Sequence, residues 1–149
     1  MRAVVQRVIE AGVSVDGKEV GRIGSGLLVY LGVSQRDTDK DLEYLVSKIS
    51  GLRIFRDEKG PMNRSVVDVG GSALVVSQFT LLGDVRRGRR PSFTDAMEPE
   101  KAERFYERFI AGLQERHVPC ASGVFGAMME IHSINDGPVT ILLDSTKLF

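Results

Sequence analysis

The sequence predicts an α/β fold in a single domain, with a mixed, mostly antiparallel and barrel-like β-sheet covered by two helices. Its length of 149 residues suits one domain spanning residues 1–149. Two segments repeat apolar residues at helical spacing, and short apolar or alternating runs lie before, between and after them. This order of strands, helix, strands, helix and strands favours helices packed against one sheet.

The first third of the chain has the pattern of β-strands. Ala3–Val8 is a short apolar-rich run, and Val13–Val15 alternates before it reaches Asp16-Gly17. That dipeptide is a strong signal for a two-residue hairpin, with the return strand over Val20–Ile23. Leu27–Val33 is apolar except for one glycine, which predicts a strand buried on both faces.

A first helix is predicted to begin after Thr38, a good N-cap residue followed by acidic side chains that suit the positive end of the helix dipole. Its apolar stripe is Leu42, Leu45, Val46, Ile49 and Leu52. Gly51 marks its C-terminal end.

The middle of the chain reads as short strands and loops. Arg53–Phe55 looks extended, Asp57–Asn63 has the composition of a turn, and Val66–Val69 is predicted as a short strand. Leu74–Leu82 begins as a buried strand and becomes polar in its second half, before a basic loop over Gly83–Pro91.

The second helix opens at Glu98-Pro99, because proline suits the first helical turn. Its apolar stripe is Ala102, Phe105, Tyr106, Phe109, Ile110 and Leu113. His117–Pro119 ends it, and two strands follow over Met128–Ile134 and Val139–Asp144. The residues between them predict a tight hairpin turn.

Composition excludes several classes of protein. Twenty basic and 20 acidic residues give zero net charge, so a globally basic nucleic-acid coat is excluded. The single Cys120 rules out an internal disulfide and is best read as a small buried hydrophobe. No apolar run approaches the roughly 20 residues of a membrane span. Without a basic-then-apolar leader, the sequence predicts a cytoplasmic location.

Standard catalytic motifs are missing. There is no Walker A loop, dinucleotide glycine fingerprint, nucleophile elbow or zinc-binding His-Glu-x-x-His helix. His117 is interpreted as a favourable charge at a helix end, and His132 as a surface or interface residue. We therefore expect no metal and no cofactor.

Ser77-Gln78-Phe79-Thr80 stands at the end of an apolar strand and could carry chemistry. Two hydroxyls, an amide and backbone N–H groups supply hydrogen-bond donors without a strong acid or base, which suits an oxyanion pocket. An ordinary amphipathic strand edge is the alternative.

Arg86-Arg87-Gly88-Arg89-Arg90 places four guanidinium groups within five residues. They repel one another unless an anion lies among them, and their geometry matches phosphate oxygens. The alternative is a solvated loop. Asn135-Asp136-Gly137-Pro138, taken alone, predicts a tight turn, with a cis peptide bond as a minority possibility.

Together these segments resemble one family, the D-aminoacyl-tRNA deacylases, and the resemblance runs nearly end to end. The segments that carry it are Met1–Val8, Gly51–Phe55, Ser77–Leu81, Gly88–Phe93 and Asn135–Thr140. Each is weak alone, but all five in this order are highly specific.

The resemblance implies a homodimer that hydrolyses the ester between a D-amino acid and the 3′-terminal adenosine of tRNA. It implies that Gly137-Pro138 is a cis pair inserted into the partner subunit's pocket, where it grips the substrate amino group and excludes L side chains. Glycyl-tRNA, which has no side chain to exclude, would then also be cleaved.

The resemblance also assigns the remaining site residues. The pocket wall is Ser77, Gln78, Phe79 and Thr80, with Phe125 and Met129 nearby and Arg7 bracing the Gly-Pro loop. Arg86, Arg87, Arg89 and Arg90 would bind tRNA phosphates without reading sequence.

Two catalytic mechanisms remain open. Thr80 could attack as a covalent nucleophile, although the sequence offers no adjacent base. Alternatively, water attacks while the Phe79 and Thr80 N–H groups hold the oxyanion and the tRNA 2′-hydroxyl assists. We favour the second mechanism. A non-catalytic RNA-binding module and a hydrolase of some other small ester are the competing functions.

Overall fold

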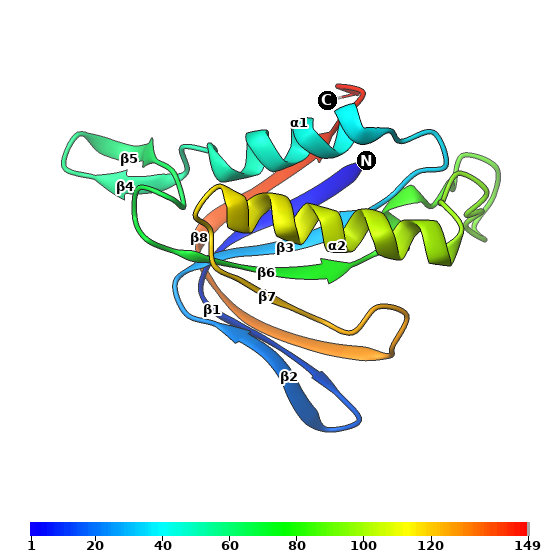
Figure 1. The fold of residues 1–149 in the computed structure, drawn as a ribbon, viewed down its shortest axis with the longest axis horizontal. Helices are drawn as coiled ribbons and strands as arrows, with labels where there is room; N and C mark the ends of the chain where they lie inside the picture. The colour runs from blue at the N-terminus through cyan, green and yellow to red at the C-terminus, as the bar shows by residue number, and fades with distance from the viewer. Residues whose placement is uncertain (149) are drawn as a thin grey trace.

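The computed structural model describes residues 1–148, which form one six-stranded sheet, a separate two-stranded hairpin and two helices (Figure 1). The large sheet contains β1 (Arg2–Val15), β2 (Lys18–Ile23), β3 (Gly26–Gly32), β6 (Ser72–Ser77), β7 (Cys120–Ser122) and β8 (Met129–Asp144). The hairpin is β4 (Phe55–Asp57) and β5 (Gly60–Arg64), and the helices are α1 (Asp39–Ser50), α2 (Pro99–Glu115) and the short 3-10 helix η1 (Phe79–Leu82). The predicted fold class, a mixed sheet with two covering helices, is confirmed.

The sheet is built around β1, which pairs antiparallel with β2, β3 and β8. The predicted hairpin after β1 is present, and its turn residues Asp16 and Gly17 have φ values of 51° and 73°. Beyond β3 the pairing is parallel, through β6 to β7. The sheet curls until β2 approaches β7, and a Cβ on Gly21 would lie 2.6 Å from the Ser122 carbonyl oxygen. This curl nearly closes a barrel.

Both helices begin at the capping residues that the sequence predicts. The Thr38 backbone N–H donates to Asp41 Oδ2 at 2.8 Å in a capping box, and Gly51 is the C-cap of α1. Pro99 occupies the first turn of α2, after Glu98 as N-cap. No helix within residues 1–148 is long and apolar enough to cross a membrane.

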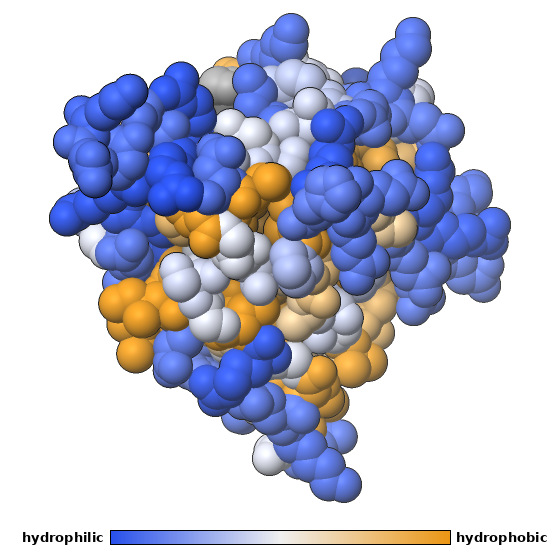
Figure 2. All heavy atoms as spheres, turned by 60° about the vertical axis from the view of Figure 1, so that its left-hand side comes forward, coloured by the Kyte–Doolittle hydropathy of each residue, from blue (hydrophilic) through white to orange (hydrophobic). Residues whose placement is uncertain are grey.

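The core has two parts because alternate residues of each strand face opposite sides. Between the sheet and the helices lie buried side chains such as Val75, Leu45 and Phe109. Inside the curl of the sheet a second cluster includes Val8 and Leu74. Burying each of these side chains contributes about 1.5–3 kcal/mol. Other hydrophobic residues remain at the surface, as one side of the molecule shows (Figure 2).

Some predicted elements were wrong. The two runs predicted at the start of the chain are a single 14-residue strand, β1, which also contains the residues between them. The loop predicted at Asp57–Asn63 contains most of a hairpin, because Asp57 Oδ1 accepts hydrogen bonds from two backbone N–H groups in its turn. Val66–Val69 is a turn rather than a strand, since Asp68 Oδ2 accepts the Ser65 N–H at 2.8 Å. Strand β7 was not predicted; it has only three residues.

The largest correction concerns residues 135–138, where the predicted hairpin turn is absent. Both halves of β8 run antiparallel to β1, with Asn135 opposite Val8 and Thr140 opposite Gln6, so the residues between them bulge outward across from Arg7. Both halves of β8 run in the same direction along β1, so the chain does not reverse at the bulge.

No peptide bond among residues 1–148 is cis, so the cis Gly137-Pro138 pair implied by the resemblance is also corrected. Gly137 instead bends the chain with a φ of 70°, which glycine adopts without strain.

Candidate active site

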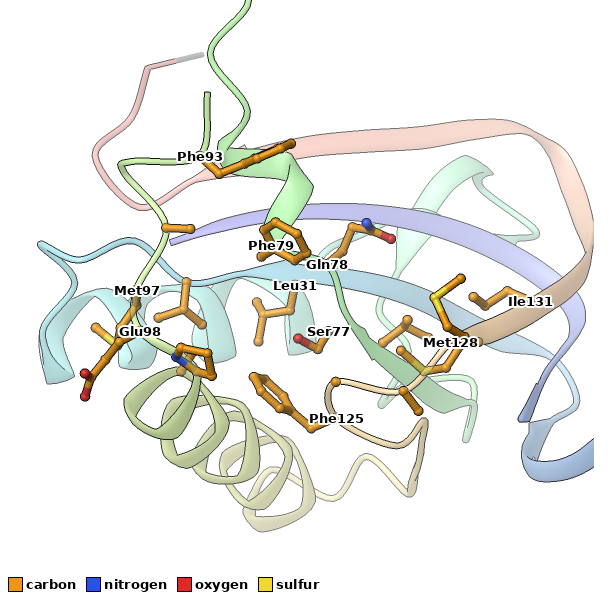
Figure 3. A pocket seen from close by; sticks show the side chains of 18 residues that line it. Leu31, Ser77, Gln78, Phe79, Phe93, Met97, Glu98, Phe125, Met128 and Ile131 are labelled. Carbon is orange, nitrogen blue, oxygen red and sulfur yellow. The ribbon is translucent and has the colours of Figure 1, made fainter. Parts of the chain in front are cut away.

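A cavity of about 690 Å³ opens where β3 and β6 end (Figure 3). Its wall is completed by the start of α2 and by the loop that precedes β8. Five predicted site residues line this cavity, namely Ser77, Gln78, Phe79, Phe125 and Met129. The Gln78 N–H donates to the Leu31 carbonyl at 2.8 Å, which holds the polar segment against the end of β3.

The cavity wall is largely apolar and aromatic. The rings of Phe79 and Phe93 pack edge to face, with centroids 5.1 Å apart, and both lie at one side of the cavity in Figure 3. On the other side Phe125 packs against Tyr106 at 5.9 Å. Phe79 is 56% exposed, so its ring is available to a planar ligand. Such a surface suits a group with a flat apolar face.

Two backbone donors stand beside this wall. Within residues 1–148, the N–H groups of Phe79 and Thr80 have no hydrogen-bond acceptor. The Thr80 hydroxyl accepts a hydrogen bond from Gln78 Nε2, an amide that cannot take up a proton. Thr80 itself is exposed and is not part of the cavity lining. The segment therefore offers hydrogen-bond donors next to the cavity, and no base for its hydroxyl.

Ionisable groups are nearly absent from the wall. Glu98 is the one ionisable residue among those that line the cavity, and it is half exposed beside Lys101 at 3.4 Å. Neither histidine contributes: His132 lies 3.9 Å from Glu10 elsewhere on the sheet. No group of three or more metal-ligating side chains occurs among the described residues.

Cys120 also lies outside the cavity. It is partly buried, and burial raises the pKa of its thiol to about 11. A thiol that stays protonated near neutral pH is a poor nucleophile.

The predicted arginine cluster forms an exposed loop that is closed by paired backbone hydrogen bonds between Asp84 and Ser92 at 2.8 and 2.9 Å. Arg86 pairs with Asp84 at 2.6 Å, and its guanidinium lowers the pKa of that carboxyl to about 2. Within residues 1–148 the other three arginines, Arg87, Arg89 and Arg90, have no ion pair. The loop therefore presents three uncompensated positive charges rather than four.

Arg7, Gly137 and Pro138 do not line the cavity of their own chain. Arg7 is 3% exposed, and its Nε and Nη2 donate to the Asp136 carbonyl at 3.0 and 2.8 Å. Its Nη1 donates to the Ile54 carbonyl at 2.5 Å. The guanidinium therefore braces the Gly-Pro segment, while that segment itself is exposed.

Several lining residues were missed as site residues. Phe93, Met97, Glu98 and Ala127 are among them. Phe93 ends the Gly88–Phe93 motif, and Glu98 was noticed only as the start of a helix, so the signals available were indirect. Their meeting at one cavity depends on the packing of α2 against the ends of β3 and β6.

Comparison with known proteins identifies the family of the chain. A family model described as D-Tyr-tRNA(Tyr) deacylase matches residues 4–144. Proteins named D-aminoacyl-tRNA deacylase from Thermotoga petrophila and Koribacter versatilis are 60% and 58% identical over 149 residues, covering 100% of both chains in each pair.

Two solved structures share the fold. One, described as "c-Myc DNA Unwinding Element Binding Protein", has a TM-score of 0.91 at 48% identity and covers 97% of this chain and 98% of its own. The other, described as "a probable eukaryotic D-amino acid tRNA deacylase", has a TM-score of 0.79 at 22% identity, covering 95% and 97%. The second likeness shows the fold alone.

The family model and the full-length relatives define a hydrolase that acts on ester bonds. The chain belongs to the D-Tyr-tRNA(Tyr) deacylase family, whose model matches nearly its full length.

Proposed function

We propose that this chain hydrolyses D-aminoacyl-tRNA in the cytoplasm, releasing the free D-amino acid and tRNA. Water attacks the ester carbonyl carbon, the bond to the ribose oxygen breaks, and that oxygen leaves with a proton. The names of the relatives, at 60% and 58% identity over the full chain, support this substrate.

The observation that carries the catalytic proposal is the pair of unpaired backbone N–H groups at Phe79 and Thr80, beside the cavity. Negative charge develops on the carbonyl oxygen as water adds, and two fixed donors stabilise it. Removing one such donor in other enzymes lowers kcat by roughly 10²–10³.

Water is favoured over Thr80 as the nucleophile. The Thr80 hydroxyl accepts a hydrogen bond from the Gln78 amide, and no carboxylate or imidazole contacts it among the described residues. A hydroxyl nucleophile needs an adjacent base. The 2′-hydroxyl of the substrate supplies the assistance that the protein side chains do not.

The aromatic wall suits the terminal adenosine of tRNA. Stacking of a base on an aromatic side chain contributes about 1–3 kcal/mol and needs no charged partner. Phe79 and Phe93 on one side and Phe125 on the other supply such faces around a cavity of about 690 Å³. The adenosine would place its ester next to the donors of Phe79 and Thr80.

A second copy of the chain is the proposed cover for the open face of the sheet. On the face away from the helices, Leu142, Val4, Tyr30 and Val76 form one row across four neighbouring strands. Leu142 is 56% exposed and Val4 and Tyr30 are half-buried, while Val76 lines the cavity. Val76 is already buried within the chain, so it is burial of Leu142, Val4 and Tyr30 that would stabilise a homodimer and bring the partner beside the cavity.

The Gly137-Pro138 segment would act on the cavity of the partner subunit. Within one chain Arg7 is opposite Leu27, whereas Ser77 is opposite Leu31, so the segment and the cavity are about 13 Å apart along the strands. Rigid backbone from the partner would fix the substrate amino group and collide with an L side chain. The glycine of glycyl-tRNA has no side chain to collide with this backbone, so glycyl-tRNA would be cleaved slowly.

Single-turnover hydrolysis of one tRNA charged with D-tyrosine or L-tyrosine, with a chelator present, tests the proposal. We expect rapid loss of the D-ester and survival of the L-ester. The Pro138→Ala variant should lose discrimination while keeping turnover. Cleavage of neither ester by the wild-type protein would refute the function.

Binding of a nucleic acid without turnover is the second candidate function. It is favoured by the neighbour named for a DNA unwinding element, which shares 48% identity, and by the three uncompensated arginines of the loop. Retention of tRNA by a wild-type protein that cleaves no ester would select it.

A further inference from the structure

The β4–β5 hairpin is a second basic element that the proposed chemistry leaves unused. It projects from the end of the molecule opposite the arginine loop, at the left of Figure 1. Residues 53–64 contain four basic side chains and two acidic ones, so the segment carries a charge of +2. Such a local excess in a chain of zero net charge favours an anionic partner.

The basic side chains of the hairpin are exposed and lack ion-pair partners within residues 1–148. Arg53 Nε donates to the Asn63 carbonyl at 2.8 Å, and Arg64 donates to the Asp68 carbonyl. Both acceptors are neutral, although the charges of Arg53 and Arg64 also contribute to lowering the pKa of the nearby Asp68 carboxyl. The side chains of Arg56 and Lys59 make no hydrogen bond to any residue from 1 to 148, and both are exposed to a ligand.

The acidic Asp57 faces its own turn. Its Oδ1 accepts the backbone N–H groups of Lys59 and Gly60 at 2.7 and 3.1 Å, and its Oδ2 accepts the Asn63 amide. These hydrogen bonds lower the pKa of the carboxyl. The Asp57 carboxylate therefore shapes the turn, and the outer surface carries the four basic residues together with one exposed acid, Glu58.

Arg7 ties this hairpin to the Gly-Pro segment. Its Nη1 donates to the carbonyl of Ile54, the residue that precedes β4, at 2.5 Å, while Nε and Nη2 hold the Asp136 carbonyl. Arg7 is 3% exposed, so the guanidinium that makes these bonds is itself buried. Arg7 therefore couples the position of the Gly-Pro segment to that of Ile54, the residue before β4.

We propose that the β4–β5 hairpin contacts the phosphate backbone of the tRNA whose 3′ end occupies the partner subunit's cavity. This inference rests on the proposed function, since it requires the Gly-Pro segment to enter that cavity. From Ile54 to Lys59 the hairpin extends about 16 Å beyond the Arg7 junction, so its tip can contact backbone phosphates away from the ester itself. The arginine loop of one subunit and the hairpin of the other then bind the same tRNA.

Charge reversal of the two basic side chains without hydrogen-bond partners tests the contact with tRNA. Arg56→Glu with Lys59→Glu should raise KM for D-tyrosyl-tRNA about tenfold, leave kcat unchanged, and reduce the slope of log affinity against log salt by about 1.4. Cleavage of D-tyrosyl-adenosine, which has no phosphate backbone, should be unchanged. The matched control is Lys40→Glu with Arg104→Glu, an equal charge change on exposed, unpaired helical residues. This control should leave KM for D-tyrosyl-tRNA and KM for D-tyrosyl-adenosine within twofold of the wild-type values.

Mixed dimers test the direction of the contact. Ala127→Trp fills the cavity of one subunit and should abolish turnover as a homodimer. If the hairpin variant and Ala127→Trp are on the same subunit, the active cavity faces a reversed hairpin and KM should rise. If they are on different subunits, the active cavity faces a normal hairpin and KM should match wild type.

Each negative result has a distinct meaning. The opposite pattern in the mixed dimers would overturn contact in trans, and an unchanged KM in the hairpin double variant would overturn the contact altogether. A wild-type protein that cleaves neither D-ester would refute the proposed function instead. Equilibrium binding of uncharged tRNA, measured on the same variants, still tests the hairpin in that case.

Discussion

Arg7→Met removes the guanidinium that joins the Gly-Pro segment to the start of the β4–β5 hairpin, while keeping an apolar side chain of similar length. The wild-type group makes hydrogen bonds to the Asp136 carbonyl at 3.0 and 2.8 Å and to the Ile54 carbonyl at 2.5 Å. It also lies 3.1 Å from Asp136 Oδ2. The variant leaves the Ile54 carbonyl buried without this donor.

The expected loss of unfolding free energy follows from these contacts. Hydrogen bonds to a charged group contribute about 1.5–3 kcal/mol each, but water can replace the bonds at the half-buried Asp136. The Asp136 carboxylate is 48% exposed, so its ion pair adds little. We expect a loss of about 3 kcal/mol, most of it from the Ile54 carbonyl.

Urea unfolding at one fixed protein concentration measures this loss, because the stability of the proposed homodimer would also depend on protein concentration. The midpoint should fall with an unchanged m-value. Hydrolysis of D-tyrosyl-tRNA, measured where the variant is still folded, should decrease as well, since the Gly-Pro segment is no longer held.

Arg7→Lys is the matched control. An ammonium group cannot reach both carbonyls, so it should restore less than half of the lost free energy. A loss below about 1 kcal/mol in Arg7→Met, with normal hydrolysis, would show that the junction is not structural and that the reasoning is wrong.

Three further predictions follow from other contacts. The pKa of the Asp84 carboxyl is lowered from an ordinary 3.8 to about 2. Its pair with Arg86 therefore stabilises the folded state above about pH 4, and this stabilisation is lost as the pH falls through about 2. In Arg86→Ala, NMR titration should find the pKa of Asp84 raised toward 3.8. Gly26→Ala places a Cβ 1.9 Å from a backbone carbonyl of β6 and should cost about 3 kcal/mol, whereas Gly24→Ala meets nothing within 4 Å and should unfold like wild type in a thermal melt. Replacing the three unpaired arginines of the loop over Arg87–Arg90 by glutamine should reduce the salt dependence of tRNA binding by about 2 in the logarithmic slope, and an unchanged slope would remove them from the contact.

Local signals in the sequence determined the helices and the first hairpin. Thr38 and Gly51 cap the two ends of α1, Pro99 begins α2, and Asp16-Gly17 forms the turn between β1 and β2. These features were predictable because caps and turns depend on residues that are neighbours in the chain. The apolar runs also predicted β3 and most of β6 correctly.

The site was predictable only in part. Ser77, Gln78, Phe79, Phe125 and Met129 were expected together and do line one cavity. Glu98 and Phe93 were missed as lining residues, because nothing local to either indicates which strands its helix or loop will meet.

The segment at residues 135–138 shows where local reasoning fails. Asparagine, aspartate, glycine and proline predict a turn, and in isolation the backbone would favour one. In the fold, β1 pairs with the chain on both sides of the segment, and buried Arg7 of that neighbouring strand donates to the Asp136 carbonyl. The sequence by itself determined the local elements and the residue types of the site. Tertiary structure decided the bulge, the cavity and the Arg7 junction, because each depends on contacts between residues that are far apart in the chain.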